Sequence, residues 1–306
     1  MKILIATEKP FAKAAVDGIA SIAKEAGHNL ALLEKYSSAE ELYKAVSDAD
    51  ALIVRSDKVT KEVIDAAGNL KIVVRAGAGY DNLDLSACTQ RGIVAMNTPG
   101  QNSNAVAELA IGMMIYMSRN SFNPGTGSEL KGKSVGIHAY GNVGRLVAKL
   151  AKGFDMKVLA FDPFVDKTAI INDNVTPVDS IEELYEKSDF LSLHIPATPQ
   201  TKGSVGLNLL NRLPKGGCLV NTARKEIINE AELIMAMEKR EDIKYVTDVA
   251  TENHATISEK FGKRVFATPK KMGAETAEAN INAGLAAANQ IVRFFETGDK
   301  TFQVNK

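Results

Sequence analysis

The chain has little cysteine and no tryptophan. Its two cysteines, Cys88 and Cys218, lie far apart and form no CxxC pair. We therefore expect neither a disulfide framework nor a cysteine zinc site, and this cysteine usage fits the reducing cytoplasm. No spacing of histidine, cysteine, aspartate or glutamate suggests another kind of metal site.

An excess of one charge and a long apolar run are also missing. Thirty-seven basic residues balance 37 acidic ones, so no global charge attracts nucleic acid or an anionic membrane. The most apolar helix candidate, residues 105–117, is interrupted by Glu108 and is too short to cross a bilayer. Glu8 and Lys9 follow the first strand too early for a secretory signal. We expect no nucleic-acid partner and no membrane association.

Short apolar runs alternate with amphipathic stretches along the whole chain. The 306 residues are 45% hydrophobic, which suits two packed domains. This alternation indicates an α/β fold, in which parallel strands are covered by helices on both faces. Strands are predicted at residues 3–6, 30–33, 51–54, 72–74, 93–96, 134–139, 157–161, 190–194, 218–221, 245–248 and 265–267.

Two long helices, predicted at residues 102–118 and 277–296, connect the two series of strands. A polar connector rich in glycine and proline, residues 120–127, precedes the second series. Gly298 is suited to end the last helix. The sequence thus predicts two doubly wound parallel-sheet domains. The first covers residues 1–99 and is completed by about residues 287–306, and the second covers residues 100–286.

A glycine-containing turn opens the second series. Residues 135–144 read VGIHAYGNVG, so a strand leads through Ala139, Gly141 and Gly144 into a helix. The GxGxxG fingerprint of a Rossmann domain occupies this place. Its middle glycine lets the backbone approach a pyrophosphate, and its last glycine lets helix and strand pack closely. Ala139 replaces the first glycine, and we expect its backbone to avoid conformations that only glycine tolerates.

An acidic residue at the end of the next strand supports a dinucleotide site. Asp162 follows the middle glycine by about 20 residues, where a carboxylate can hold the ribose 2′-hydroxyl. It would repel a 2′-phosphate, so NAD is favoured over NADP. The alternative is a structural turn followed by a helix-capping aspartate. The residues assigned to the cofactor are Ala139, Tyr140, Gly141, Asn142, Val143, Gly144 and Asp162.

Four segments carry a resemblance to a known family. In chain order they are 97–112 (NTPGQNSNAVAELAIG), 192–196 (SLHIP), 221–224 (NTAR) and 273–279 (GAETAEA). Together they resemble the D-2-hydroxyacid dehydrogenases over nearly the whole chain. The resemblance implies a flavodoxin-like substrate domain, a Rossmann NAD domain, an active site in the cleft between them and usually a homodimer. It also implies that His194 and Thr222 line the cofactor and that Asp248 orients the nicotinamide amide.

The first domain resembles the phosphoglycerate dehydrogenase branch of that family. Residues 52–56 (LIVRS) and 75–82 (RAGAGYDN) place Arg55 and Arg75 after apolar strands. The resemblance implies that both arginines face the substrate and its phosphate, with Gly77 and Asn102 also at the substrate. Arginine suits this role because its planar fork binds phosphate and carboxylate bidentately. Surface arginines in loops are the alternative.

The resemblance also implies a catalytic arginine, glutamate and histidine. Arg224 matches the arginine, but Glu252 falls one residue before the expected position, which Asn253 occupies. Glu252 is therefore either catalytic or a solvated loop residue. The histidine is missing, because residues 268–273 read TPKKMG. Lys271 takes its place when counted from Gly273, and Lys270 when counted from Pro269. We favour Lys271, with His254 a more distant substitute.

A lysine changes the expected pH dependence. Its reference pKa is about 10.4, so it must lose a proton before it can act as the base for oxidation, whereas it is ready to act as the acid for reduction. We expect an alkaline optimum for oxidation. The implied reaction is NAD-dependent oxidation of D-3-phosphoglycerate, a phosphorylated hydroxy acid, in serine biosynthesis. The alternatives are a hydroxypyruvate or glyoxylate reductase and a non-catalytic protein that senses NAD. Since the chain stops soon after its last helix, we expect no C-terminal regulatory domain.

Overall fold

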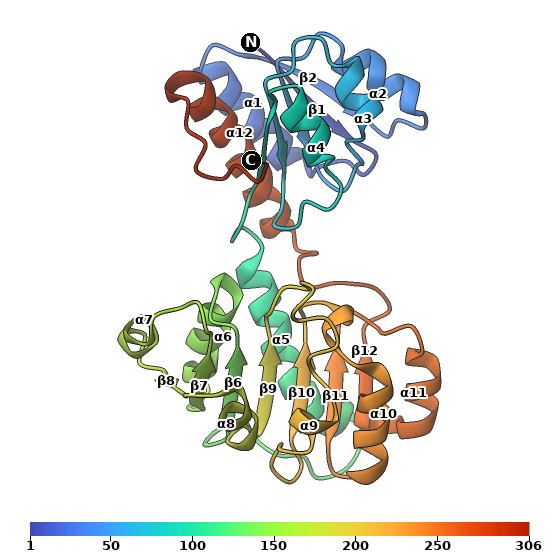
Figure 1. Ribbon diagram of the computed structural model, residues 1–306, viewed down its shortest axis with the longest axis vertical. Helices are drawn as coiled ribbons and strands as arrows, with labels where there is room; N and C mark the ends of the chain where they lie inside the picture. Colours follow the sequence, from blue (N-terminus) through green and yellow to red (C-terminus); the bar gives the residue numbers. More distant parts are fainter. Residues whose placement is uncertain (306) are drawn as a thin grey trace. The chain divides into compact units, whose positions relative to one another are not determined.

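The computed structural model describes residues 1–305, which form two compact units (Figure 1). Unit 1 contains residues 1–102 and the segment that begins at Glu275, and unit 2 contains residues 103–274. The predicted second boundary, near residue 286, falls inside the last helix, whereas the units divide before it. Within residues 1–305, no helix is both long enough and apolar enough to cross a membrane.

Unit 1 is built on a five-stranded parallel sheet in the order β2-β1-β3-β4-β5, the flavodoxin-like order. Four of its strands, β1, β3, β4 and β5, are almost wholly buried, as parallel strands covered on both faces should be, whereas the edge strand β2 is partly exposed along its whole length. The elements are β1 (Lys2–Thr7), α1 (Lys13–Glu25), β2 (Asn29–Glu34), α2 (Ala39–Val46), β3 (Ala51–Val54), α3 (Lys61–Ala66), β4 (Ile72–Arg75), α4 (Leu85–Gln90), β5 (Val94–Asn97) and α12 (Ala277–Thr297).

The last helix, α12, belongs to unit 1 because it packs along α1 (Figure 1). The two helices approach closely at glycines: a Cβ on Gly18 would lie 2.5 Å from the Leu285 side chain. Thr276 caps the start of α12 by accepting a hydrogen bond from the Ala279 amide, and Gly298 ends it at φ 73°. The predicted C-terminal glycine cap is therefore confirmed.

Unit 2 is built on a seven-stranded parallel sheet in the order β12-β11-β10-β9-β6-β7-β8. From β6 outward this is the doubly wound Rossmann arrangement, so the predicted α/β fold class is confirmed for both units. The elements are α5 (Ser103–Ser118), β6 (Ser134–His138), α6 (Asn142–Gly153), β7 (Lys157–Phe161), α7 (Lys167–Asn172), β8 (Thr176–Pro177), α8 (Ile181–Glu186), β9 (Phe190–Leu193), α9 (Leu207–Leu210), β10 (Cys218–Asn221), α10 (Glu230–Lys239), β11 (Lys244–Thr247), α11 (His254–Phe261) and β12 (Val265–Ala267), with 3-10 turns at Asn120–Phe122, Lys225–Ile227 and Gly262–Arg264.

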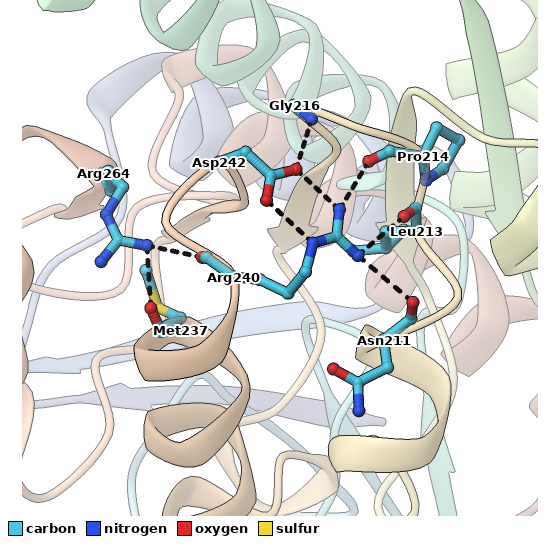
Figure 2. Close-up of polar contacts among 8 residues, drawn as sticks. All are labelled: Asn211, Leu213, Pro214, Gly216, Met237, Arg240, Asp242 and Arg264. Atoms are coloured by element: carbon cyan, nitrogen blue, oxygen red, sulfur yellow. Dashed lines mark hydrogen bonds and ion pairs between the residues drawn. The ribbon is translucent and has the colours of Figure 1, made fainter.

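The loops that lead into β10 and β11 are tied together by Arg240 (Figure 2). Its guanidinium makes two hydrogen bonds to the Asp242 carboxylate and donates to the carbonyls of Asn211, Leu213 and Pro214. Asp242 in turn accepts a hydrogen bond from the Gly216 amide at 2.7 Å. This network fixes the edge of the sheet at which these two strands begin.

Candidate dinucleotide-binding and active site

The turn between β6 and α6 has the geometry of a dinucleotide-binding turn, with one correction. Ala139 adopts φ 79°, the left-handed conformation that glycine favours, so the expectation that its backbone avoids such conformations is wrong. The chain leaves β6 at His138 and enters α6 at Asn142, and this short connection requires the sharp turn. The alanine therefore bears a conformational cost that glycine would not.

The two glycines of the turn have different surroundings. A Cβ on Gly144 would lie 2.3 Å from the carbonyl oxygen of Ala139, so this glycine is required for α6 to pack against the turn. A Cβ on Gly141 would have no atom within 4 Å. Gly141 is also the N-cap of α6, whose amides and dipole attract anions. The open space at Gly141 fits the close approach of a pyrophosphate.

Asp162 follows β7 and is held in a fixed orientation. Its two carboxylate oxygens accept hydrogen bonds from the amides of Tyr140, at 2.8 Å, and Phe164, at 2.9 Å. A cavity of about 650 Å³ lies beside it in unit 2. His138, Ile195 and Phe164 are among its other lining residues, so an acidic group meets apolar walls. This combination fits the ribose and adenine of a dinucleotide.

Two histidines lie at the carboxyl ends of β6 and β9. Burial lowers the pKa of His138 to about 4. Burial, with a smaller contribution from His138, lowers the pKa of His194 to about 3. The His194 ring nitrogen Nε2 is 2.9 Å from the Ser192 hydroxyl. Both imidazoles are therefore neutral at physiological pH, and His138, which lines the cavity, adds no charge to it.

The turn after β10 presents Thr222 and Arg224. Asn221 holds this turn, because its side chain accepts a hydrogen bond from the Ala223 amide and donates one to the Arg224 carbonyl. Thr222 is 5% exposed, and within residues 1–305 its hydroxyl has no hydrogen-bond partner. The guanidinium of Arg224 donates to the Ala223 carbonyl. A buried hydroxyl without a partner indicates a place for a ligand group.

Asp248 follows β11 and shows the same feature more clearly. The residue is 1% exposed. Its Oδ2 accepts hydrogen bonds from the amides of Gly273, at 2.6 Å, and Met272, at 3.2 Å. Its Oδ1 has no partner among residues 1–305. This oxygen can accept a hydrogen bond from a carboxamide, as the predicted role of Asp248 requires.

Arg55 and Arg75 lie together in unit 1. The Nε of Arg75 donates to the Arg55 carbonyl at 3.0 Å, and the Arg55 guanidinium donates to the carbonyls of Lys9 and Pro10 and to the Asn280 side chain. Gly77 makes room for Arg75, since a Cβ there would lie 1.5 Å from its Nη1. Asn102, the other predicted substrate residue, is the last residue of this part of unit 1 and is partly buried.

Comparison with known proteins assigns the chain to a family. Residues 100–270 match the model of the D-isomer specific 2-hydroxyacid dehydrogenase, NAD binding domain. A D-3-phosphoglycerate dehydrogenase from Methanocaldococcus jannaschii is 37% identical over 267 residues, which cover 82% of this chain and 51% of that protein. The chain belongs to the D-2-hydroxyacid dehydrogenase family. The predictions of this family and of NAD as the cofactor are confirmed.

Two further relatives are named for different activities. A hydroxypyruvate reductase from Thermotoga maritima is 35% identical, and the match covers 86% of this chain and 90% of that protein. The crystal structure of an NAD+-bound 3-phosphoglycerate dehydrogenase of Entamoeba histolytica is 52% identical, with a TM-score of 0.88 and coverage of 100% of this chain and 99% of that one. The chain spans about half the length of the Methanocaldococcus relative.

The chain has other residues at the positions where the family resemblance implies a catalytic glutamate and histidine. The Glu252 side chain is 81% exposed, and its carboxylate lies 3.2 Å from the Lys225 ammonium. Asn253, at the family position of the glutamate, donates instead to the Glu230 carboxylate. Lys270 and Lys271 are both exposed. His254 begins α11, and its Nε2 is 3.0 Å from the Ser258 hydroxyl.

The sequence analysis did not identify the residues that hold the backbone at Arg55, in the loop after β3. Asp57 is buried and accepts hydrogen bonds from the Glu8 amide, the Tyr36 hydroxyl and the Arg55 amide. Asn82 donates to the Arg55 and Asp57 carbonyls. The available signal for Asp57 was a polar residue three positions after the buried strand β3, but two of its partners, Glu8 and Tyr36, are 49 and 21 positions away in the sequence.

Proposed function

We propose that the chain catalyses the NAD-dependent interconversion of D-3-phosphoglycerate and 3-phosphohydroxypyruvate. The observation that carries this proposal is the pair of arginines, Arg55 and Arg75, joined through the Arg55 carbonyl beside Gly77. The Arg55 guanidinium donates hydrogen bonds to carbonyl and amide oxygens. Because these oxygens carry no net charge, the positive charge of Arg55 can still attract an anion. Two guanidinium groups suit a phosphate, since each offers a planar fork of donors.

Arg224 is proposed to bind the substrate carboxylate, with Gly77 and Asn102 assisting at the same substrate. Bound NAD supplies the hydride acceptor for oxidation. Lys271 is proposed to take the proton from the substrate hydroxyl during oxidation and to return it during reduction, in place of the family histidine. Glu252 is the third proposed catalytic residue; its carboxylate lies 3.2 Å from the ammonium of Lys225, the residue after Arg224, which supports this role.

The cofactor is proposed to bind in unit 2, through the residues that the sequence analysis assigned to it. Residues 139–144 would hold the pyrophosphate, and Asp162 the ribose. His194 would line the site. Thr222 and Asp248 would contribute their available oxygens, with Asp248 bonded to the nicotinamide carboxamide. The fixed carboxylate of Asp162 supports NAD rather than NADP, because a 2′-phosphate would meet its negative charge.

A second candidate function is the reduction of an unphosphorylated acid, hydroxypyruvate or glyoxylate. The near full-length similarity to the hydroxypyruvate reductase of Thermotoga maritima favours it, since 90% of that protein is covered. The two candidates differ in the phosphate, and so in their need for Arg55 and Arg75. A third hypothesis is a non-catalytic protein that senses NAD. It would bind the cofactor but would not turn over any of these acids.

The test is NADH consumption by the purified protein with 3-phosphohydroxypyruvate, hydroxypyruvate or glyoxylate. We expect the phosphorylated acid to have the highest kcat/KM. Arg55→Gln should raise its KM by roughly 100-fold, the loss of a charge-assisted contact of about 2–3 kcal/mol, and should leave the KM of hydroxypyruvate unchanged. Lys71→Gln, which removes an exposed cation from the same unit, is the matched control. Equal kcat/KM values for all three acids would reject the phosphate assignment, and NADH binding without turnover would reject the enzyme.

A homodimer in the cytoplasm completes the proposal. Light scattering on the purified protein would measure its mass, and a mass of 32.8 kDa, that of one chain, would reject the dimer. Cell fractionation would test the location.

A further inference from the structure

The loop between β11 and α11, residues 249–253, is attached at both ends. At its start, the Val249 amide donates to the Thr247 hydroxyl at 2.9 Å. At its end, Asn253 makes two hydrogen bonds to Glu230: its amide at 3.0 Å and its side-chain nitrogen at 2.8 Å. The second attachment joins residues that are 23 positions apart in the sequence, so it fixes the loop against a different element.

Glu230 is well placed to hold the loop. It is the first residue of α10, where the helix dipole favours a negative charge. Burial alone would raise its pKa, but hydrogen bonds from the loop outweigh burial and keep the pKa below its ordinary value. The carboxylate is therefore charged at neutral pH, and its two oxygens receive the two donors of Asn253.

The two neighbouring residues of the loop are thereby directed to different partners. Asn253 is bound to Glu230, while Glu252 pairs with Lys225 at 3.2 Å. Lys225 directly follows Arg224, so the loop after β11 meets the segment after β10 through Glu252 and not through Asn253.

We propose that Glu230 is a positioning residue that holds Asn253 and so presents Glu252, rather than its neighbour, beside the Arg224–Lys225 segment. This inference rests on the proposed dehydrogenase function, in which Glu252 acts on the reaction. It explains how a glutamate displaced by one residue can serve the site: the amide at the usual position is bound elsewhere.

The first experiment removes the attachment. Glu230→Ala should lower kcat for 3-phosphohydroxypyruvate about tenfold, because small displacements of reacting groups are costly. NADH affinity should stay unchanged. Glu230→Ala should have no further effect on kcat in a Glu252→Gln background, since it acts through that residue. Glu226→Ala removes a nearby exposed carboxylate as the matched control. Equal losses of kcat with and without Glu252 would overturn the proposal.

A second pair of variants separates positioning from general damage to the fold. Asn253→Asp places a carboxylate against Glu230 and should repel the loop, with a loss of kcat similar to that of Glu230→Ala. Adding Glu230→Gln should restore kcat, because the glutamine amide can donate to the new carboxylate while its oxygen still accepts from the residue-253 amide. Failure of the double variant to recover activity, with an unchanged melting temperature, would overturn the proposal.

Hydrogen–deuterium exchange gives a readout that does not need turnover. Residues 249–254 should exchange faster in Glu230→Ala and Asn253→Asp than in the wild type and in the double variant. An unprotected loop in the wild type, or equal exchange in all variants, would reject the role of Glu230. If the wild type turns over none of 3-phosphohydroxypyruvate, hydroxypyruvate and glyoxylate, the proposed function is rejected instead. The two failures are thus distinguishable.

Discussion

Two pairs of polar residues at opposite edges of the sheet in unit 2 differ in whether they have hydrogen-bond partners. At the edge where β10 and β11 begin, the charges of Arg240 and Asp242 pair with each other and with backbone groups (Figure 2). At the edge where the same strands end, Thr222 and Asp248 are buried with an oxygen that has no partner among residues 1–305. Buried polar groups are normally satisfied, so we infer that Arg240 and Asp242 serve stability at the first edge and that Thr222 and Asp248 are placed for a ligand at the second.

The largest expected effect is a loss of activity at the second edge. Arg224→Gln should lower kcat/KM by roughly 10²–10³-fold, equivalent to about 2.7–4 kcal/mol, because the substrate carboxylate would lose its charged partner. The side chain makes a hydrogen bond to its neighbour's carbonyl, so the free energy of unfolding should change by less than about 0.5 kcal/mol. Steady-state kinetics and urea denaturation measure both quantities. A large loss of stability with intact kcat/KM would reverse the assignment of the two edges.

The first edge should give the opposite result. Arg240→Ala removes a bidentate ion pair and three bonds to carbonyls. We expect it to lower the free energy of unfolding by about 2–3 kcal/mol, while KM for NADH and kcat at 25 °C stay near the wild-type values. Lys215→Ala, an exposed cation nearby, is the control. A stable but inactive Arg240 variant would contradict the comparison.

The free energy of unfolding, measured as a function of pH, tests the contribution of the Asp242 charge at the same edge. Hydrogen bonding to Arg240, the largest cause, holds the pKa of Asp242 far below its ordinary value. A depressed pKa contributes stability that is present above the unfolded-state pKa of about 3.9 and is lost as pH falls toward the folded value. Asp242→Asn should therefore cost about 1–2 kcal/mol between pH 5 and 8, and the difference from wild type should shrink below about pH 4. A cost independent of pH would show that the charge is not responsible.

The fold was more predictable than the site because buried parallel strands leave a direct signal. The bounds predicted for β3, β7, β10 and β12 match the structure, since each contains a run of at least three apolar residues. β8 was missed because it has two residues, Thr176 and Pro177. A strand so short has no periodicity to read.

The site depends on contacts between residues far apart in the chain, which no local pattern reports. Roles for Asp162 and Asp248 were predicted from the sequence, but the backbone amides that orient their carboxylates were not. The contact of Asp57 with the Glu8 amide spans 49 positions, and that of Asn253 with Glu230 spans 23. Which loop residue meets Lys225 could therefore not be decided from spacing.

The smallest expected effect concerns Ala139, where local sequence rules and the structure disagree. Its φ of 79° is strained for an alanine, and an alanine at positive φ costs more than the roughly 0.4–1 kcal/mol of chain entropy that it saves. Ala139→Gly should thus raise the free energy of unfolding by up to about 1 kcal/mol. Gly144→Ala, whose new Cβ would lie 2.3 Å from the Ala139 carbonyl, should lower it. Urea denaturation of the two variants measures the contrast. Because the turn keeps its shape in Ala139→Gly, the Kd for NADH should not change; a weaker Kd would mean that the alanine methyl group itself contacts the cofactor.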